Sequence, residues 1–450
     1  CSVFAGGFDL TAAVQVGGGD VLDEHAVLEL LDSLVRKSLV AVDQSSGTTR
    51  YTLLETIRQF AEDQLAASGV GDEIRDRHTN YFADAAHAIL EVWASPKQRV
   101  AHAWLDAELA NLRAAFRWAM ERDKLDTAAT LVVSAAVIGF FAQRFEPVAW
   151  AEEILLDSRC DDLRHTRGLY AAASICHRLG RPEDGVRYGE IGLALLGQAG
   201  HDAVPYGVDY AFLSGAHIFA GQMDRALEAC AAGSNSEADP MGTLRTGIAW
   251  ALAAMSRFEE AMVMADGVVA SAEATGVPSS IAFALDAYGK AFAESDPVRA
   301  LAAKRRAWSV AHDHGVRLFE AFIARDLAGL EASHGDRQTG LQLFDDSIDS
   351  FQQSGEVGPL AGTLATLAVF LDRVDRPRAA ATLYGAISHD TFAMAAFPGL
   401  PVAAEHLREV LGTAAFDALT REGASLDRSQ AVAYAHAEIQ RVRDEIGDSP

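Results

Sequence analysis

The segment GRPEDG at residues 180–185 returns in altered form along much of the chain. Later copies are GQMDRA, SRFEEA, SDPVRA, GDRQTG and DRPRAA, which open at residues 221, 256, 295, 335 and 375. The mean step is about 39 residues, which suits a unit of two helices joined by a turn. A small or polar opener ends one helix, polar residues turn the chain, and a small residue lets the next helix lie close to its partner. The repeat therefore predicts tetratricopeptide-like (TPR-like) hairpins that stack into an α-solenoid.

Composition supports an all-α protein and limits its partners. The chain has 450 residues, half of them hydrophobic, which is too long for one ordinary domain unless most of it is a repeat array. Acidic residues number 63 against 38 basic ones, for a formal charge of −25. Because binding to phosphates requires a clustered basic face, we expect no direct nucleic acid contact by this segment. The acidity is best explained by the solubility of a large helical surface, and an acidic docking face is the alternative.

Cysteine usage and hydropathy indicate a cytoplasmic protein that does not enter a membrane. The four cysteines, Cys1, Cys160, Cys176 and Cys230, are too sparse for a disulfide framework. Residues 127–143 are uncharged, but their many alanines favour a buried solenoid helix over a membrane span. We therefore expect a reducing cytoplasm and no membrane partner.

Residues 1–68 differ from the repeats and predict a small module of their own. The expected order is a helix at 9–16, a loop at 17–20, an amphipathic helix at 24–37, a β-hairpin of strands 38–43 and 49–54 joined by 44–48, and a helix at 55–67. This is the order of a winged-helix module that lacks its first helix. The chain begins at Cys1 rather than Met, so we expect it to be part of a longer protein.

The remaining sequence divides into three predicted parts. Residues 69–120 form a helical connector, 121–390 the TPR-like repeats, and 391–450 a C-terminal helical segment in which two prolines interrupt the pattern at 391–401. The connector's aromatic side chains have helical spacing, which is more typical of a core than of a platform for stacked bases. They include Tyr81, Phe82, Trp104, Phe116 and Trp118. No Ser/Gly-rich linker separates the parts, so we expect them to pack together.

No pattern in the sequence predicts a nucleotide site or a nucleophile. A phosphate loop requires G-x-x-x-x-G-K-[ST], and Gly289-Lys290 is a chance dipeptide that lacks both the first glycine and the Ser or Thr. The glycines at 17–19 precede a helix, a position from which backbone N–H groups can bind an anion, but a flexible turn is the simpler interpretation. No G-x-S-x-G elbow occurs.

Candidate metal ligands are equally weak. His312 and His314 lie two residues apart, so a helix would point them in different directions, and the following Gly315 favours a helix end. Cys176-His177, and Cys160 with His165, lack two further ligands, and Cys176 is most simply a small buried hydrophobe. Acidic pairs at 161–162, 259–260 and 345–346 are expected at turns or helix N-termini, where they complement the helix dipole. We predict no catalytic, metal-binding or cofactor-binding residue, no cofactor, and no enzymatic activity.

Three strings at the N-terminus resemble a known family. They are SVFAGGFDLTAA (2–13), LLDSLVRKSLV (30–40) and RYTLLETIRQFAEDQL (50–65), and the closing region 383–426 adds to the likeness. Together they resemble the winged-helix and TPR-like region of actinobacterial STAND (NB-ARC-type) ATPase regulators. Many such proteins end in a LuxR-type helix-turn-helix, and some begin with an adenylate/guanylate cyclase domain. The ATPase core, the cyclase and the LuxR domain are missing from these residues. In related ATPases a His of the winged-helix region can contact the nucleotide, and nothing marks His25 for that role.

The resemblance implies a function, and two rivals stay open. The leading hypothesis is the sensor and autoinhibitory region of a transcriptional regulator, in which a protein partner or small inducer binds the solenoid groove and the winged module relays that event to the ATPase core. The alternative is a stand-alone TPR adaptor that scaffolds other proteins. An enzymatic role survives only if an upstream cyclase domain lends its name to the whole protein.

Overall fold

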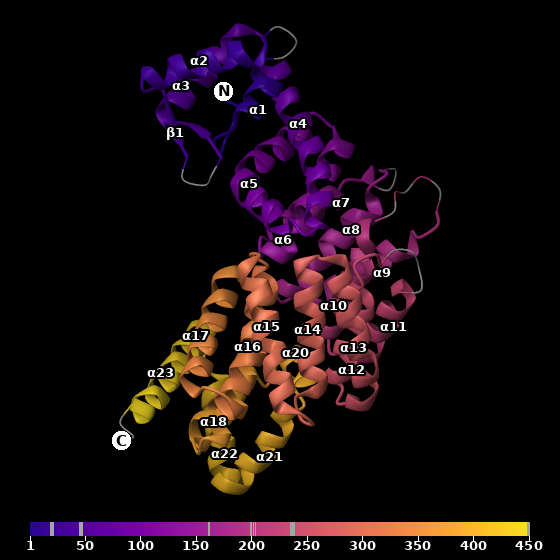
Figure 1. Cartoon of the computed structure of the whole chain (residues 1–450), viewed down its shortest axis with the longest axis vertical. Helices are drawn as coiled ribbons and strands as arrows, with labels where there is room; N and C mark the ends of the chain where they lie inside the picture. The colour runs from indigo at the N-terminus through magenta and orange to yellow at the C-terminus, as the bar shows by residue number, and fades with distance from the viewer. Residues whose placement is uncertain are drawn as a thin grey trace.

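The computed structural model describes residues 1–18, 22–44, 48–160, 163–198, 200, 202, 204–234 and 239–447. Within these ranges the chain is an all-α protein apart from one small hairpin (Figure 1). The acidic pair at 161–162, Gly19 and Asp20 of the expected loop, and the centre of the hairpin connection lie outside the described residues.

The N-terminal module has the predicted order of elements. It contains α1 (Leu10–Ala12), the π-helix η1 (Ala13–Gly18), α2 (Glu24–Arg36), β1 (Val40–Asp43), β2 (Arg50–Leu53) and α3 (Glu55–Ser68). The Asp9 carboxylate caps the first helix by accepting a hydrogen bond from Ala12 N at 2.8 Å. The strands are antiparallel, with Val40 opposite Leu53. The loop predicted from residue 17 is wrong at its start, because residues 17 and 18 continue the helix as its last turn.

Two long helices form the connector, α4 (Gly71–Trp93) and α5 (Gln98–Glu121). Phe82 and Phe116 are buried, as expected for core aromatics. Trp118 is only half-buried, and the guanidinium carbons of Arg75 and Arg122 lie 5.2 and 4.4 Å from its ring centroid. The connector's aromatics therefore serve packing between helices.

The repeats are helical hairpins that follow one another along the chain. They are α6 (Leu125–Ala142) with α7 (Glu146–Leu155), α8 (Thr166–Ser174) and η3 (Ile175–Leu179) with α9 (Pro182–Ala194), α10 (Val208–Phe219) with α11 (Met223–Ser234), α12 (Thr243–Ala254) with α13 (Phe258–Thr275), α14 (Pro278–Phe292) with α15 (Pro297–Asp313), α16 (Arg317–His334) with α17 (Arg337–Ser354), and α18 (Val357–Arg373) with α19 (Pro377–Ile387). A short 3-10 turn, η4 (Pro205–Gly207), precedes α10.

Every copy of the repeated motif falls between the two helices of a hairpin, as predicted. The opener takes the left-handed conformation at Gly180, Gly221, Ser256 and Asp375, with φ of 86°, 74°, 59° and 59°. The small residue five positions later is buried in all six copies, at residues 185, 226, 261, 300, 340 and 380. A Cβ at Gly185 would lie 2.7 Å from the carbonyl oxygen of Ser174 on the preceding helix. Close approach of the paired helices therefore depends on the small residue.

Helix α6 corresponds to the uncharged stretch at 127–143. Among the described helices it is the one that is long and apolar enough to cross a membrane, and 78% of its span is buried inside the fold. It packs against α4, α5, α7 and α8, the environment predicted for a buried solenoid helix.

The array curves until late repeats touch the connector. Gln98 of α5 donates to Ser279 of α14 at 2.9 Å, and Arg317 of α16 is paired with Asp106 of α5 at 3.0 Å. Gln143, after α6, donates to Glu356 before α18 at 2.6 Å. These contacts span roughly two hundred residues of sequence, so the array is closed on itself rather than extended.

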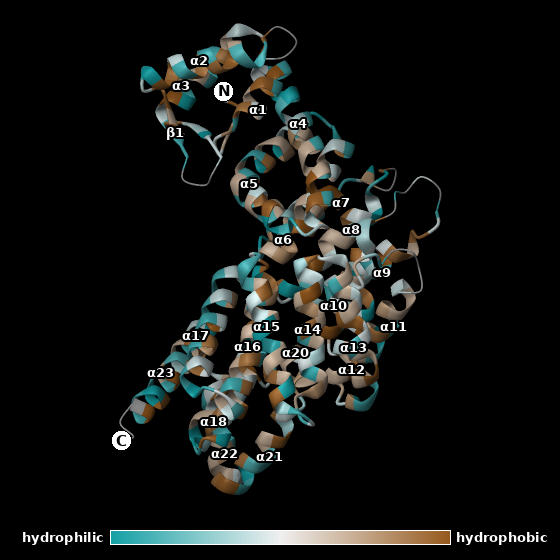
Figure 2. Cartoon of the chain, in the orientation of Figure 1, coloured by the Kyte–Doolittle hydropathy of each residue, from teal (hydrophilic) through white to brown (hydrophobic). Residues whose placement is uncertain are grey.

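The C-terminal segment is helical from its first residue. It consists of α20 (Thr391–Ala396), α21 (Gly399–Leu411), α22 (Thr413–Ala424) and α23 (Arg428–Gly447). The interruption predicted at 391–401 is confirmed only in part: Phe397 and Pro398 separate α20 from α21, whereas Pro401 lies in the first turn of α21. Helix α23 packs along α17, and both carry mixed polar and apolar residues at the edge of the molecule (Figure 2).

Candidate functional site

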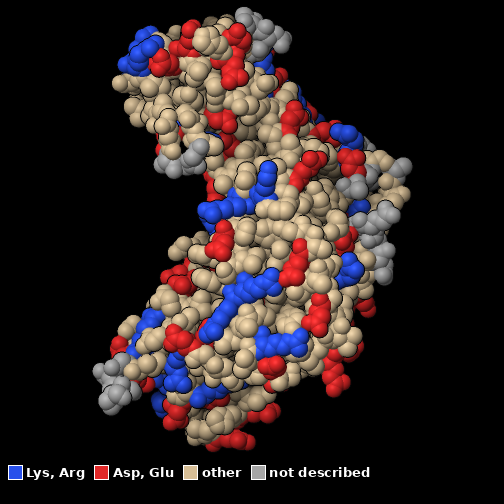
Figure 3. All heavy atoms as spheres, viewed as in Figure 1, with Lys and Arg blue, Asp and Glu red and all other residues tan. Residues whose placement is uncertain are grey.

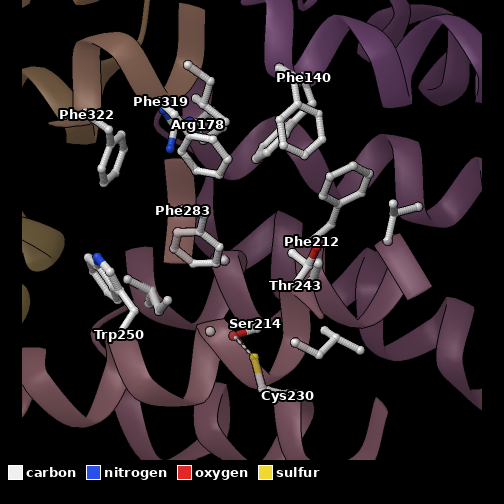
Figure 4. A pocket seen from close by; sticks show the side chains of 18 of the residues that line it. Phe140, Arg178, Phe212, Ser214, Cys230, Thr243, Trp250, Phe283, Phe319 and Phe322 are labelled. Carbon is white, nitrogen blue, oxygen red and sulfur yellow. Dashed lines mark hydrogen bonds between the residues drawn. The ribbon is translucent and has the colours of Figure 1, made fainter. Parts of the chain in front are cut away.

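An aromatic cavity lies inside the curve of the array. Its volume is about 130 Å³. The first helices of successive hairpins supply most of its wall: α6, η3, α10, α12, α14 and α16, with additions from α4, η4, α11 and α20 (Figure 4). Because these helices are spaced along more than two hundred residues, only the curvature of the array brings them together.

Aromatic rings make up much of the wall. They are Trp93, Phe140, Phe141, Tyr206, Phe212, Phe219, Trp250, Phe283, Phe319, Phe322 and Phe392. Phe283 and Phe319 are stacked at 5.1 Å, and Trp93 contacts Phe141 at 5.1 Å between ring centroids. The cavity is therefore suited to an apolar or aromatic group.

One cation, Arg178, lies among these rings. Its guanidinium carbon is 5.1 Å from the ring centroid of Phe219 and 5.0 Å from that of Phe322. Its Nε donates to the fully buried carboxylate of Glu356 at 2.6 Å, so the pair is formally neutral. Burial lowers the pKa of Arg178, and the Glu356 charge opposes that shift.

Behind the wall is a cluster of five charged side chains, which we call the cation cluster: Lys290, Lys304, Arg325, Asp286 and Asp326. Lys304 Nζ lies 2.5 Å from Asp286 and 3.0 Å from Asp326, and Arg325 Nε donates to Asp326 at 2.7 Å. Burial opposes ionisation of Asp326, but Arg325, Lys304 and Lys290 outweigh it and hold its pKa well below the usual value. Three cations formally face two anions, a positive excess of one, and burial lowers the pKa of Lys290 against that excess.

The cation cluster shares Asp286 with the cavity wall and contacts two further wall residues. Trp250 lines the cavity, donates its Nε1 to Asp286 at 3.2 Å, and lies 5.1 Å from Lys290 Nζ. Phe322 also lines it and lies 4.3 Å from the guanidinium carbon of Arg325. Charge in the cluster therefore acts on the cavity directly at Asp286, and through one layer of side chains at Lys290 and Arg325.

Several buried donors near the cavity lack a hydrogen-bond partner within the described ranges. They are Trp93 Nε1 and Arg178 Nη2 in the wall, and Arg325 Nη1 and Nη2 behind it. Arg178 Nη2 still contacts the Glu356 carboxylate as an ion pair. Unpaired buried donors are costly, which makes them candidates for a ligand's acceptor atoms.

A single helix joins the cavity to the N-terminal module. At one end of α4, Trp93 lies in the cavity wall. Toward the other end, His78 and Phe82 contact Phe4 of the module, at 5.3 and 6.3 Å between ring centroids. One continuous helix of 23 residues thus contacts both.

A buried polar contact fixes the module to α5, as the lack of a linker suggested. The fully buried Asn111 accepts a hydrogen bond from Ala5 N and donates to Gly7 O, both at 2.8 Å. Arg50 of β2 is paired with Glu108 of α5 at 2.5 Å.

His312, His314 and His25 each make contacts of their own. His312 contacts Glu320 at 2.8 Å and stacks on Trp308, whereas His314 contacts Val310 O and caps the end of α15. His25 is exposed and 3.4 Å from Glu29. Over the described ranges, no three His, Cys, Asp or Glu side chains gather as a metal site.

The cysteines of interest are buried and separate. Cys176 is fully buried, and burial raises the pKa of its thiol to about 12. His177 beside it lines the cavity, and burial, helped by the charge of Arg178, lowers its pKa to about 3. Cys160 is also buried, and His165 lies 3.1 Å from Thr130.

One expectation for the acidic pairs is wrong. Glu259 and Glu260 lie in the first turn of α13, as predicted. Asp345 and Asp346 instead lie in the middle of α17, where Asp345 binds His436 at 2.6 Å and Arg443 at 2.7 Å. Asp345 therefore joins α17 to α23 rather than complementing a helix dipole.

The cavity and the cation cluster were missed by reasoning from sequence. Gly289-Lys290 is no phosphate loop, yet Lys290 belongs to the cation cluster. The sequence does contain a sign of buried charge at this place. Asp286 and Lys290 are charged residues four positions apart in the largely apolar stretch 278–292. Nothing local indicates that Arg178 meets Glu356, 178 residues away.

Comparison with known proteins identifies the N-terminal module. Residues 1–66 match the family model of the winged helix-turn-helix domain. A protein of Mycobacterium tuberculosis (strain H37Rv), provisionally named as an HTH-type transcriptional regulator, is 39% identical over 171 residues, which are 38% of this chain and 19% of that protein. An uncharacterized protein of the same strain is 37% identical over 82 residues, 18% of this chain and 21% of that protein. The chain spans about a fifth of the length of these curated relatives.

Two solved structures share a distant likeness. A Rap protein in complex with Competence and Sporulation Factor has a TM-score of 0.48 at 10% identity, over 83% of this chain and 99% of that one. A STAND protein with a tetratricopeptide repeat sensor from Pyrococcus horikoshii has a TM-score of 0.40 at 13% identity, over 94% of this chain and 64% of that one. At these TM-scores neither match carries an argument about this chain.

Proposed function

We propose that this chain is the sensor and interaction region of a transcriptional regulator. An effector binds in the aromatic cavity, and the winged module relays that event to an ATPase core elsewhere in a longer protein. The matched winged helix-turn-helix domain and the regulator-like relatives support a regulatory role. The proposal assigns no catalytic step to this chain and places it in the cytoplasm.

The observation that carries the proposal is the reach of α4. Its Trp93 end forms part of the cavity wall, and its His78 and Phe82 pack on Phe4 of the winged module. A shift of one end of a packed helix displaces the other, because helices deform little along their axis. Occupancy of the cavity can thus bias the position of the winged module.

The charge of the winged module favours a protein partner over DNA. Residues 1–66 contain ten acidic and four basic side chains. On the face shown in Figure 3, acidic side chains are spread along the molecule and basic ones lie among them rather than in one continuous patch. Because DNA binding requires clustered cations, the module's role is a relay rather than base reading.

The same module exposes apolar side chains suited to docking. Leu30, Leu54 and Phe60 are 53%, 61% and 63% exposed. In α3, which the structure describes throughout, no side chain is fully buried. An ATPase core that packs on α2 and α3 would cover these residues.

Hydrogen exchange measured by mass spectrometry tests the relay in the 450-residue chain. Trp93→Phe replaces the indole at the cavity end of α4 by a smaller phenyl ring. This change should speed amide hydrogen exchange in residues 4–18. Trp308→Phe on α15, which does not line the cavity, should leave exchange in residues 4–18 unchanged, so it is the matched control. Equal effects of the two variants on residues 4–18, or none from either, would remove the relay and leave the adaptor hypothesis.

A further inference from the structure

We infer that the ligand of the aromatic cavity is a small organic carboxylate whose apolar body is about the size of one aromatic ring. The ring lies among the phenylalanines, and the carboxylate faces Arg178 and Trp93. This inference deepens the proposed sensor function and rests on it.

Size gives the first argument. The cavity volume is about 130 Å³. An apolar cavity of about 150 Å³ in another protein holds benzene. A single ring therefore fits, whereas several residues of a peptide cannot lie inside the cavity together.

Buried polar atoms in the cavity wall give the second argument, which concerns the chemistry of the ligand. In the wall, Trp93 is fully buried and its Nε1 has no hydrogen-bond partner within the described ranges. Nη2 of the buried Arg178 is held in the ion pair with Glu356. Both atoms are donors, and the indole N–H is the one without a partner. The carboxylate of Asp286 is already engaged, by Lys304 at 2.5 Å and by Trp250 at 3.2 Å. A ligand with acceptor oxygens would therefore satisfy the donors in the wall.

The charge of the side chains around the cavity favours a carboxylate ligand over one with a neutral carbonyl group. The Arg178–Glu356 pair is neutral, and the cation cluster behind the wall carries one positive charge in excess. Arg325, which is fully buried, has two terminal nitrogens without a hydrogen-bond partner among the described atoms. Its guanidinium and that of Arg178 contact the same Phe322 ring, at 4.3 and 5.0 Å. An anion in the cavity neutralises this excess at close range, and a neutral ligand does not.

The test compares two probes of equal shape. 4-Fluorobenzoate and 4-fluorobenzamide are titrated into the 450-residue chain, and binding is followed by fluorine NMR line width and by calorimetry. The benzoate should bind about tenfold more tightly or better, as expected when a hydrogen bond to a charged group replaces a neutral one.

The variant Arg325→Met tests whether the preference for 4-fluorobenzoate over 4-fluorobenzamide arises from the excess positive charge. The variant leaves Lys290 and Lys304 against Asp286 and Asp326, so the interior becomes neutral and the fold should be retained, as a melting curve will show. The benzoate preference should fall to about twofold or less, an outcome that roughly removes the charged contribution. Arg306→Met is the control, because Arg306 is half-exposed on α15 and paired with Glu273.

Trp93→Phe tests the second donor without depending on the stability of Arg325→Met. It keeps a ring in the wall and removes the indole N–H, so it should weaken 4-fluorobenzoate binding more than 4-fluorobenzamide binding. Trp104→Phe on α5, which does not line the cavity, is the control.

Equal affinity for both probes overturns the carboxylate, and saturable binding of neither at millimolar concentration overturns the ring-sized ligand. A Trp93→Phe effect identical for both probes also overturns the assignment of the donor. Failure of the relay is distinguishable: 4-fluorobenzoate would then bind, yet hydrogen exchange in residues 4–18 would not change.

Discussion

Asn111 shows how much of the interface between winged module and connector depends on one side chain. It accepts from Ala5 N, donates to Gly7 O, and also donates to Glu108 at 2.6 Å. The backbone groups that it satisfies belong to a segment without regular hydrogen-bonded structure, so no neighbouring strand replaces it. Sequence reasoning predicted that the parts would pack together but could not name this residue, because an amide within a helical pattern looks the same whether it faces water or a partner.

Replacement of Asn111 by alanine should loosen the module without unfolding the solenoid. The change leaves Ala5 N–H and Gly7 C=O without their partner, a loss of about 1–3 kcal/mol. Hydrogen exchange should therefore accelerate in residues 1–18 and stay constant in α10–α19. Asn80→Ala on the exposed face of α4 is the control, and identical exchange in both variants would contradict the role of Asn111.

His177 predicts a loss of stability in acid. Burial lowers its pKa to about 3, from an ordinary value of 6.5. Below pH 6.5 the unfolded chain takes up a proton on this residue that the native state refuses until about pH 3. Stability is thus fully present above pH 6.5 and declines as pH falls, by about 1.4 kcal/mol per pH unit for this one group.

Urea unfolding between pH 7 and pH 4.5 measures this effect. His177→Asn should show a shallower decline than the natural chain. His78 and His102, with pKa values lowered to about 4 by burial, act in the same direction and will remain in the variant. Parallel curves for variant and natural chain would show that His177 is protonated in the native state.

At the scale of elements, the sequence predicts what is local. The hairpin turns were predictable because the opener and the small residue act within one turn of the chain. Of the two prolines at 391–401, Pro398 lies in the break between α20 and α21. Pro401 lies in the first turn of α21, where a proline costs no hydrogen bond and so does not break the helix. The same physics places prolines in the first turns of α9, α14, α15 and α19.

Two serines at equivalent openers should respond differently to glycine. Ser256 has φ of 59°, which strains any residue with a Cβ, whereas Ser295 is not among the described residues with positive φ. Ser256→Gly should therefore raise the free energy of unfolding by about 0.5–1 kcal/mol, since glycine adopts this conformation freely. Ser295→Gly should leave it unchanged or lower it by about as much, and urea melts that rank the two variants in the opposite order would refute the comparison.

At the scale of the whole molecule, closure of the array decides both the site and the cooperativity. The cavity could not be predicted, because the curvature of a solenoid depends on small rotations per repeat that no local pattern encodes. The contacts that close the array, including Gln143 with Glu356 and Gln98 with Ser279, also connect its early and late repeats. An open array can unfold repeat by repeat, but a closed one should unfold in fewer, larger steps.

Glu356→Gln tests that closure. The change removes the counter-charge of the buried Arg178, which costs about 3–5 kcal/mol. Circular dichroism and tryptophan fluorescence should both shift to lower urea concentration and remain coincident. Glu409→Gln on the exposed face of α21 is the control. A Glu356→Gln variant in which only one of the two signals shifts would show that the repeats unfold independently.

The pairing of Arg178 with Glu356 also bears on how the protein is made. The 178 residues between them take about 10–35 s to synthesise at ordinary ribosomal speeds. Asn111 and the segment that it binds emerge well before that, so the winged module can dock while the later repeats are still being translated. Arg178 meanwhile has no counter-ion, and the rings around it cannot close over a bare charge. The last stage of folding therefore waits for Glu356, and during this interval the apolar rings around Arg178 stay exposed to aggregation.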